Sequence, residues 1–324
     1  MTGSMRAVVL SGPGPVENLA VVERPVPEPP PGWVRVKVAA FGLNRSELHT
    51  RLGLAEGVTF PRVPGIEAVG VVDSDCDLPV GQRVAAMMGG MGRVFDGGYA
   101  EYAVVPREVL IPFGSDLPWE VLGAVPETLQ TAYGSLTTGL DLRAGQSLLI
   151  RGGTSALGFA ATALANDIGA TVLATTRRAD RLDVLREHGV AHPLVDDGAV
   201  AERVREVFPD GVDAALELGG TPTLPDTLAA TKVHGTVCFT GMLSNEWIVR
   251  DFYPIGYLPK GVRLTAYGGE ASDLPADVLQ RFLDQVAGGE VTLGPTTVYR
   301  LEDIRRAHDD LEHGRRVGKL VVLV

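Results

Sequence analysis

One stretch constrains the fold of this chain more than any other: residues 147–181, where an apolar run meets a glycine pair and a helical pattern follows. Residues 148–150 are apolar throughout, as in a parallel strand buried on both faces, and the run breaks at Gly152 and Gly153. From residue 156 apolar side chains recur at helical spacing until Gly169. The stretch therefore predicts a strand, a tight turn and a helix in succession.

A turn of this kind is suited to an anion. The N-terminus of a helix presents unpaired backbone N–H groups and the positive end of the helix dipole, which together hold a pyrophosphate without a lysine. The dinucleotide-binding fingerprint G-x-G-x-x-G is present with one glycine missing, and glycine-rich turns also occur in many other folds. The predicted phosphate contacts are Gly153, Thr154, Ser155, Ala156, Leu157 and Gly158.

The end of the next predicted strand, residues 171–176, distinguishes the two nicotinamide dinucleotides. About 20 residues beyond the glycine turn an acidic residue binds the ribose 2′-hydroxyl of NAD, and the sequence has no acid there. It reads Thr-Thr-Arg-Arg over 175–178, and hydroxyl and guanidinium donors suit a 2′-phosphate. The sequence thus predicts NADPH; the alternative is that these arginines belong to a solvated loop. The predicted contacts are Thr175, Thr176, Arg177 and Arg181.

Length and composition limit the class of protein. The chain has 324 residues, 45% of them hydrophobic and 21% charged, which fits a globular protein of two domains. Its net charge of −11 argues against nucleic acid as the main partner, because phosphate binding requires a basic face. Neither a signal peptide nor a membrane span is expected. The only cysteines, Cys76 and Cys238, suit a reducing cytoplasm and exclude a disulfide framework.

The first part of the chain, up to about residue 119, has short β-like runs bounded by Gly, Pro or Asp. In residues 34–38 valines alternate with Arg and Lys, as in a strand with one buried face. This part is expected to form an irregular β-rich domain. Its predicted strands are 6–10, 19–23, 34–38, 69–73, 82–87, 99–105 and 109–112.

Strands and helices then alternate, which specifies a parallel sheet with helices on both faces. The last part has helical patterns at 275–286 and 301–312 and an apolar strand at 319–324, and is expected to complete the first domain. The sequence therefore predicts an α/β protein with domains at 1–120 and 121–262 and a return to the first domain at 263–324. The strands predicted for the parallel sheet are 148–150, 172–175, 192–195, 212–217 and 236–240.

Five motifs together give the chain a family resemblance. They are AAFGLNRSEL at 39–48, PGIEAVG at 64–70, GGYAEY at 97–102, the glycine turn at 152–158 and GKLV at 318–321. With them the chain resembles the medium-chain dehydrogenase/reductase superfamily, and within it the zinc-independent NADPH:quinone oxidoreductase-like branch, over nearly its whole length. The resemblance implies a GroES-like β domain, a Rossmann domain with a parallel doubly wound sheet, an active-site cleft between them, and a homodimer.

The resemblance also bears on metal binding. Zinc-dependent alcohol dehydrogenases of this superfamily hold a catalytic metal with a Cys, a His-Glu pair and a later Cys, and the first three of these positions match Asn44, Ile66 and Glu67 here. Zinc needs three or four N, S or O donors, so we predict no metal site. Residues 87–98, where the structural zinc lobe of that family lies, contain no Cys. The six histidines, at 49, 188, 192, 234, 308 and 313, are expected on the surface or in loops.

The predicted lack of a metal ion limits the class of substrate that the protein could reduce. A quinone or an activated enone delocalises the incoming charge onto an oxygen, so its reduction by NADPH does not require a Lewis acid. The leading hypothesis is therefore an NADPH-dependent reductase of quinones or other α,β-unsaturated carbonyls. Two alternatives remain: a 2-enoyl thioester reductase of the same superfamily, and a non-catalytic NADPH-binding redox sensor. A thioester carrier would need a basic entry patch, which is not evident in so acidic a chain.

The resemblance also assigns roles to individual residues. Asn44 matches a position whose amide lies close to the nicotinamide and could donate a hydrogen bond to cofactor or substrate; alternatively it serves a turn. His49, where some quinone reductases have a tyrosine, could donate a proton, although a solvated loop histidine or a proton from water is an alternative. Thr131, Thr240, Gly241 and Met242 are expected beside the nicotinamide. Lys319 matches a lysine that reaches the cofactor phosphates, unless it is an ordinary surface lysine.

Overall fold

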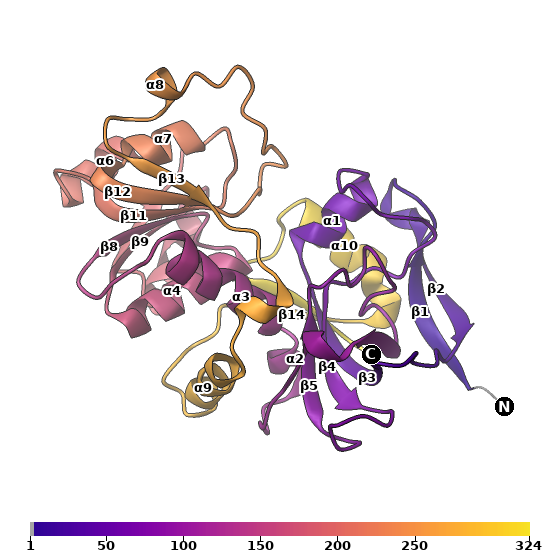
Figure 1. Ribbon diagram of the computed structural model, residues 1–324. Helices are drawn as coiled ribbons and strands as arrows, with labels where there is room; N and C mark the ends of the chain where they lie inside the picture. Colours follow the sequence, from indigo (N-terminus) through magenta and orange to yellow (C-terminus); the bar gives the residue numbers. More distant parts are fainter. Residues whose placement is uncertain (1–2) are drawn as a thin grey trace. The chain divides into compact units, whose positions relative to one another are not determined.

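The computed structural model describes residues 3–324, which form two compact units (Figure 1). The first unit contains the described chain up to Gln130 together with Glu270–Val291 and Pro295–Val324, and the second contains Thr131–Gly269 and Thr292–Gly294. The boundaries thus fall later than the expected ones after residues 120 and 262. The first boundary lies inside helix α3 (Pro126–Gly134), where the composition of the sequence does not change.

The first unit is built on antiparallel strands. A seven-stranded sheet has the order β14-β15-β3-β4-β5-β7, with β6 also paired to β3, and a separate hairpin joins β1 to β2. Among the described strands of this unit, only β14 and β15 are parallel neighbours. This is the expected GroES-like β domain. The strands are β1 (Ser4–Leu10), β2 (Leu19–Pro25), β3 (Trp33–Leu43), β4 (Glu67–Val72), β5 (Arg83–Met87), β6 (Tyr102–Pro106), β7 (Leu110–Pro112), β14 (Thr296–Arg300) and β15 (Lys319–Leu323).

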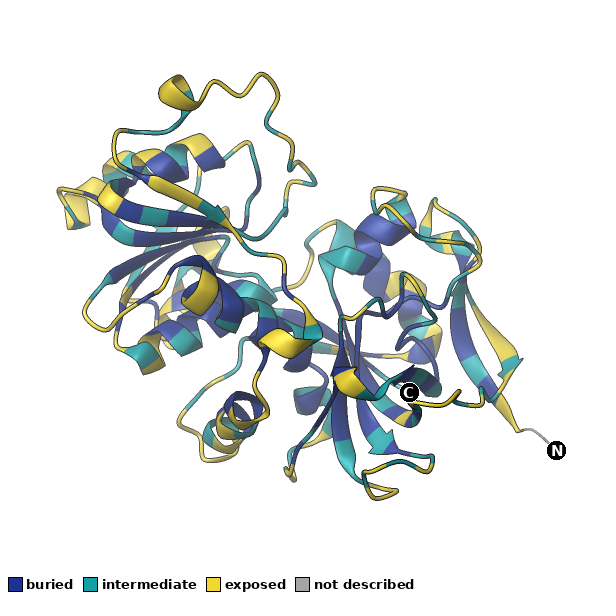
Figure 2. Ribbon diagram, in the orientation of Figure 1, coloured by how far each residue is buried: buried dark blue, intermediate teal, exposed yellow. Residues whose placement is uncertain are grey.

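The alternation in the sequence explains the burial of β3. Val34, Val36 and Val38 are buried, whereas Lys37 between them is exposed. This face contributes to one hydrophobic cluster that also includes residues of the hairpin and of the C-terminal strands (Figure 2). Burial of each such valine contributes roughly 1.5–3 kcal/mol to folding. The helices of this unit are α1 (Arg45–Leu52), α2 (Trp119–Leu122), α9 (Ala276–Ala287) and α10 (Ile304–Glu312).

The second unit is the predicted Rossmann domain. Its six strands are all parallel and have the order β10-β9-β8-β11-β12-β13, so the order reverses between β8 and β11. In sheets of this kind ligands bind at the carboxyl ends of the strands where the order reverses. The strands are β8 (Ser147–Arg151), β9 (Thr171–Thr176), β10 (His192–Val195), β11 (Val212–Glu217), β12 (Thr231–Phe239) and β13 (Arg263–Ala266).

Helices connect these strands, as the right-handed crossovers of a parallel sheet require. They are α4 (Ala156–Ile168), α5 (Leu182–Glu187), α6 (Ala201–Val207), α7 (Leu224–Ala229) and the short α8 (Pro254–Tyr257). Figure 2 shows the strands largely buried and α8 exposed. None of the helices within residues 3–324 is both long and apolar enough to cross a membrane.

Candidate functional site

The glycine turn has the predicted form, because its glycines lie where a side chain would not fit. A Cβ on Gly153 would lie 2.6 Å from the Cβ of Ala174, and one on Gly158 would lie 2.6 Å from the carbonyl oxygen of Gly153. Gly152 has a φ of 98°, which favours glycine. The turn therefore connects β8 to α4 with the backbone of both elements in close contact.

Ser155, at the position of the missing glycine, is the N-cap of α4. Its hydroxyl accepts a hydrogen bond of 3.0 Å from the N–H of Gly158 and donates one of 2.8 Å to the carbonyl of Gly152. Among the residues that the structure describes, the turn does not use the backbone N–H groups of Thr154, Ala156 and Leu157. These three donors at the positive end of a helix are suited to a phosphate group.

Two adjacent threonines end β9, and their hydroxyl groups have different partners although both were predicted to contact the cofactor. Thr175 is fully buried, and its hydroxyl accepts a hydrogen bond from the N–H of Gly152 at 3.1 Å and donates one to Asp196 at 3.1 Å. The Thr175 hydroxyl therefore already makes two hydrogen bonds inside the protein. Thr176 is also buried, and its hydroxyl accepts a 3.4 Å hydrogen bond from the N–H of Arg178.

Three arginines lie directly beyond β9. Arg177 is exposed, and Arg178 is engaged by Asp180 through two hydrogen bonds of 3.0 and 2.5 Å. Burial and the neighbouring guanidinium groups of Arg178 and Arg177 lower the pKa of Arg181. The carboxylate of Asp180 pairs with Arg178 and partly offsets the effect of its neighbours on Arg181, and guanidinium groups at a strand end are suited to a phosphate.

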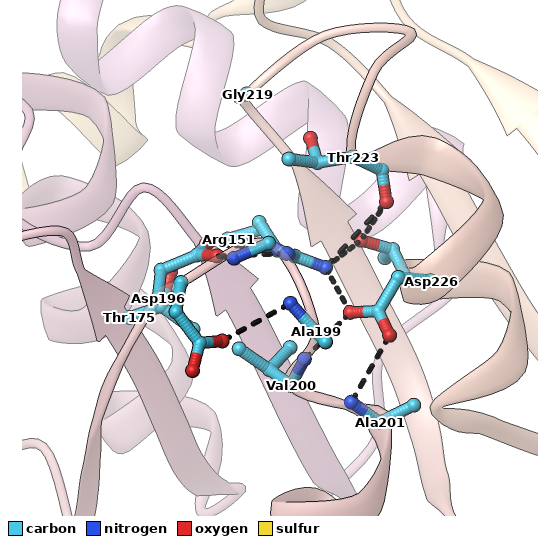
Figure 3. Close-up of polar contacts among 12 residues, drawn as sticks. Arg151, Thr175, Asp196, Ala199, Val200, Ala201, Gly219, Thr223 and Asp226 are labelled. Carbon is cyan, nitrogen blue, oxygen red and sulfur yellow. Dashed lines mark hydrogen bonds and ion pairs between the residues drawn. The ribbon is translucent and has the colours of Figure 1, made fainter.

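A buried polar network that the sequence analysis missed joins the strand ends (Figure 3). Arg151, the last residue of β8, donates two hydrogen bonds to Asp196 after β10, at 2.7 and 2.8 Å, and one to Asp226 of α7 at 2.5 Å. Asp226 in turn accepts the backbone N–H groups of Val200 and Ala201 at the start of α6. The one signal in the sequence is a charged residue directly after a buried apolar run.

The carboxylates at these strand ends already accept hydrogen bonds from groups inside the protein. Both oxygens of Asp196 accept hydrogen bonds from Arg151, and they also accept from Thr175 and from the N–H of Gly198. Glu217, at the end of β11, accepts from the N–H groups of Gly219 and Gly220 at 2.6 and 3.1 Å. Burial nevertheless raises the pKa of Glu217.

Thr131 and Thr240, predicted beside the nicotinamide, are linked through Ser135. The Ser135 hydroxyl donates to the carbonyl of Thr131 at 2.6 Å and lies 3.0 Å from the hydroxyl of Thr240. Gly241 follows, and a Cβ there would lie 2.7 Å from the Cα of Leu218, so a side chain would not fit. Met242 comes next and is half-buried. The structure therefore brings these predicted residues together within the second unit.

In the first unit, Asn44, Glu67 and Lys319 form a polar cluster. The ammonium nitrogen of Lys319 lies 2.7 Å from Oε1 of Glu67, 2.5 Å from Oδ1 of Asn44 and 2.9 Å from Oγ1 of Thr128. Nδ2 of Asn44 donates to the same Oε1 of Glu67 at 3.0 Å. Oε2 of Glu67 accepts a 2.9 Å hydrogen bond from the backbone N–H of Glu127.

The charges of this cluster are buried. Lys319 is 4% exposed and Glu67 is 0% exposed, so Lys319 is not a surface lysine. Burial lowers the pKa of Lys319, but the carboxylates of Glu67 and Glu127 outweigh that effect and raise it. Glu47 of α1 accepts backbone N–H bonds from Asn44 and Ile66 at 2.9 and 2.8 Å. Burial, and to a smaller extent the charge of Glu67, raises the pKa of Glu47 to about 7.

The expectation that the histidines lie on the surface or in loops is wrong for two of them. His49 lies on α1 and is 8% exposed, because α1 packs its inner face into the first unit. His308, on α10, is fully buried, with Nε2 3.2 Å from the hydroxyl of Tyr99. Burial, together with the nearby charge of Arg51, lowers the pKa of His308 to about 3, so its ring is neutral.

The residues at the catalytic zinc position of related dehydrogenases do not fit zinc. Asn44 and Ile66 replace two ligands, and the carboxylate of Glu67 is already engaged by the ammonium group of Lys319. Throughout residues 3–324, no group of three or more His, Cys, Asp or Glu side chains is arranged to hold a metal ion. A tetrahedral zinc site needs three or four N, S or O donors, and these residues do not supply them.

Comparison with known proteins gives matches over both units. The family model of the alcohol dehydrogenase GroES-like domain matches residues 30–115, and that of the zinc-binding dehydrogenase matches residues 156–284. The quinone oxidoreductase of Lama guanicoe is 29% identical over 99% of this chain and 98% of its own length. The synaptic vesicle membrane protein VAT-1 homolog of Danio rerio is 30% identical over 99% of this chain and 70% of its own length.

A solved structure is also similar. A mycobacterial protein complexed with NADPH has a TM-score of 0.86 and 26% identity, and the match covers 99% of this chain and 100% of that one. The similarity therefore extends from the sequence to the three-dimensional fold and includes both units.

Proposed function

The chain belongs to the medium-chain dehydrogenase/reductase superfamily, in its quinone oxidoreductase-like branch, and on that premise we propose that it is an NADPH-dependent reductase that works without a metal ion. Its proposed acceptor is a quinone or another α,β-unsaturated carbonyl compound. The proposal rests on two features at neighbouring strand ends: a glycine turn suited to a phosphate after β8, and the guanidinium groups of Arg177 and Arg181 after β9. The NADPH complex of a similar protein supports the same cofactor.

The residues of the glycine turn fit the pyrophosphate of the proposed cofactor. The N–H groups of Thr154, Ala156 and Leu157 would donate to it, and Ser155 keeps the turn in shape. Arg177 and Arg181 would hold the 2′-phosphate, with Thr176 at the strand end beside them. Thr175 is left out of this set because its hydroxyl is already committed.

The buried network favours a 2′-phosphate over a free 2′-hydroxyl. A ribose hydroxyl would need a carboxylate as acceptor, and the carboxylate beside the end of β9 belongs to Asp196. Its two oxygens already accept from Arg151, Thr175 and the N–H of Gly198. A carboxylate whose lone pairs are all used cannot accept a further strong hydrogen bond.

NADPH, when bound, supplies the hydride, so that a quinone, NADPH and one proton give a hydroquinone and NADP⁺. The side-chain amide of Asn44 would donate a hydrogen bond to the acceptor oxygen on which negative charge develops. His49 or water would supply the proton. Thr131, Thr240, Gly241 and Met242 would position the nicotinamide.

The proposal is tested by mixing the purified protein with NADPH and 9,10-phenanthrenequinone and following the absorbance of the nicotinamide. Oxidation of NADPH well above background, with NADH much less effective, is the expected result. A parallel panel of enones and enoyl thioesters distinguishes the alternatives. Turnover with thioesters alone would identify a 2-enoyl thioester reductase, and cofactor binding without any turnover would identify a sensor. Stoichiometric zinc in the purified protein would refute the metal-free mechanism.

We further propose a cytoplasmic homodimer, as the family resemblance implies. The strand β13 is at the edge of its sheet, and an unpaired edge is a surface that proteins cover. Four apolar residues of the segment before it are exposed, namely Ile248, Phe252, Tyr253 and Ile255. Both cysteines are free thiols, as expected in a reducing compartment. Analytical sedimentation measures the oligomeric state of the protein and of the variant Ile255→Glu. We expect the wild type to sediment as a dimer and Ile255→Glu as a monomer.

A further inference from the structure

Where related dehydrogenases use a zinc ion, this chain has an ammonium group of its own. We propose that Lys319 is a positioning residue: together with Glu67 it fixes the side-chain amide of Asn44 so that the amide presents an N–H donor to the acceptor. This inference rests on the proposed function, because it takes Asn44 as the group that contacts the acceptor. It replaces the expectation that Lys319 reaches the cofactor phosphates.

The two charged neighbours leave one orientation for the Asn44 amide. An ammonium group only donates hydrogen bonds, and an ionised carboxylate only accepts them. The amide atom that faces Lys319 at 2.5 Å must therefore be the oxygen, and the atom that faces Glu67 at 3.0 Å must be the nitrogen. Either charge alone already excludes the reversed amide, so this constraint is lost only when both charges are removed.

The ammonium group has no hydrogen left for another ligand. Its three hydrogens match three acceptors, on Glu67 at 2.7 Å, Asn44 at 2.5 Å and Thr128 at 2.9 Å. Binding a cofactor phosphate would break one of these contacts inside the protein, where an unmatched polar group is costly. The contacts therefore favour a role in orienting Asn44 over a role in phosphate binding.

A glycine in β3 provides space for the ion pair of Lys319 and Glu67. Gly42 of β3 lies beneath it, and a Cβ there would collide with Oε1 of Glu67 and with Cε of Lys319. The backbone of Asn44 is held separately, by the 2.9 Å hydrogen bond from its N–H to Glu47. Both the backbone and the side chain of Asn44 are therefore fixed before any ligand binds.

This arrangement determines what Asn44 can recognise. Its amide nitrogen carries two hydrogens, and Glu67 accepts one of them. Within the described part of the chain, no hydrogen bond is found for the second, which therefore remains for an external acceptor. The group that binds there must offer an oxygen that accepts a hydrogen bond, and the carbonyl oxygen of the proposed quinone or enone does so.

The test is a double-mutant cycle with Lys319→Met and Asn44→Ala, in which kcat for quinone reduction and the Kd of NADPH are both measured. If Lys319 acts through Asn44, each single change should lower kcat by about tenfold or more, and the double variant should be no worse than the poorer single variant. The Kd of NADPH should stay within about twofold of the wild type. Lys37→Met, which changes an exposed lysine of β3, is the matched control.

Two additions keep the test decisive. Because Lys319→Met leaves Glu67 as an unpaired buried charge, the balanced variant Lys319→Met/Glu67→Gln is measured alongside it and should show the same loss of kcat. The NMR signals of the two Asn44 side-chain amide protons should be well separated in the wild type and in Lys37→Met, and should converge in Lys319→Met/Glu67→Gln, which lacks both charges. This spectrum requires no turnover, so it tests the orientation even if no acceptor is reduced.

Other outcomes would overturn the inference. Independent, multiplicative losses of kcat in the double variant would show that Lys319 acts apart from Asn44. A Kd of NADPH raised about tenfold or more in Lys319→Met, with kcat unchanged, would assign the lysine to the phosphates. Unchanged amide signals in Lys319→Met/Glu67→Gln would show that Asn44 is oriented by other groups. Failure of the proposed function itself has a different signature, namely a wild type that reduces no quinone or enone.

Discussion

Lys319 and Glu67 meet in the interior of the first unit, with Nζ of one 2.7 Å from Oε1 of the other. Lys319 begins the last strand of the chain and Glu67 begins β4, and neither strand is the other's neighbour in the sheet. Their side chains meet over β3, which lies between those two strands in the sheet. The stability of this unit therefore depends on a match of charge between distant parts of the sequence.

Removal of one charge should cost more than removal of both. Lys319→Met leaves a buried carboxylate without its partner, and we expect the free energy of unfolding to fall by about 3–5 kcal/mol. Lys319→Met/Glu67→Gln removes both charges and should recover most of that loss. Urea unfolding at neutral pH measures both values. A double variant that is as unstable as the sum of the two single variants would contradict this prediction.

Arg177 should contribute to cofactor choice. Its guanidinium group is exposed, and we propose that it contacts the 2′-phosphate. In Arg177→Ala the Kd of NADPH should rise about tenfold, which corresponds to about 1.4 kcal/mol, and the Kd of NADH should not change. Arg186→Ala is the control, because Arg186 lies on α5 and is paired with Asp183. Equal weakening of both cofactors would count against a 2′-phosphate contact.

Gly158→Ala should damage the phosphate-binding turn. The new Cβ would lie 2.6 and 2.7 Å from the carbonyl oxygens of Gly153 and Gly152, so the turn backbone would have to shift. Because a misplacement of about 1 Å can cost on the order of a hundredfold, the Kd of NADPH should rise by at least tenfold. Gly268→Ala, which meets no atom within 4 Å, should bind NADPH normally. Calorimetric titration checks both variants.

Glu47 should make the protein less stable as the pH rises through the mildly acidic range. Burial raises the pKa of this carboxyl from 4.5 to about 7, so the folded state holds a proton that the unfolded state has lost. The stabilisation from Glu47 is complete below pH 4.5 and is lost as the pH rises to about 7. Glu47→Gln should show a flatter dependence of the unfolding free energy on pH over that range. An unchanged slope would mean that Glu47 titrates normally.

His308 should act in the opposite direction. Burial lowers its pKa from 6.5 to about 3, so the unfolded state takes up a proton that the folded state excludes. The stabilisation from His308 is present above pH 6.5 and is lost as the pH falls toward 3. In His308→Gln, thermal unfolding should depend less on pH in this range than in the wild type. A variant that loses stability in acid as steeply as the wild type would disprove the assignment.

The sequence predicted well the elements that have strong local signals. The apolar run at 148–150 forms the interior of β8, the glycine pair follows that strand, and α4 ends before Gly169, as expected. Period-two alternation likewise identified β3. In contrast β13 (Arg263–Ala266) was missed, because it is short, largely exposed and at the edge of its sheet, so its sequence lacks an apolar pattern.

The polar interior could not be predicted from local pattern. The sequence assigned Lys319 either to the cofactor phosphates or to the surface, and its partners Asn44 and Glu67 were not foreseen because they lie in distant segments that only the folded sheet brings together. Arg151 and Asp196 are linked in the same way across two strands. Thr175 and Thr176 have the same side chain, yet only the structure reveals that Thr175 points into this network.

Ser155 has a consequence for the speed of cofactor binding. Its two hydrogen bonds hold the phosphate-binding turn in its final shape in the free protein. Little conformational entropy would then be lost on binding, and no slow rearrangement of the turn would precede it. The association rate should accordingly be set by diffusion and by attraction of the phosphates to the arginines, and should fall as salt is added.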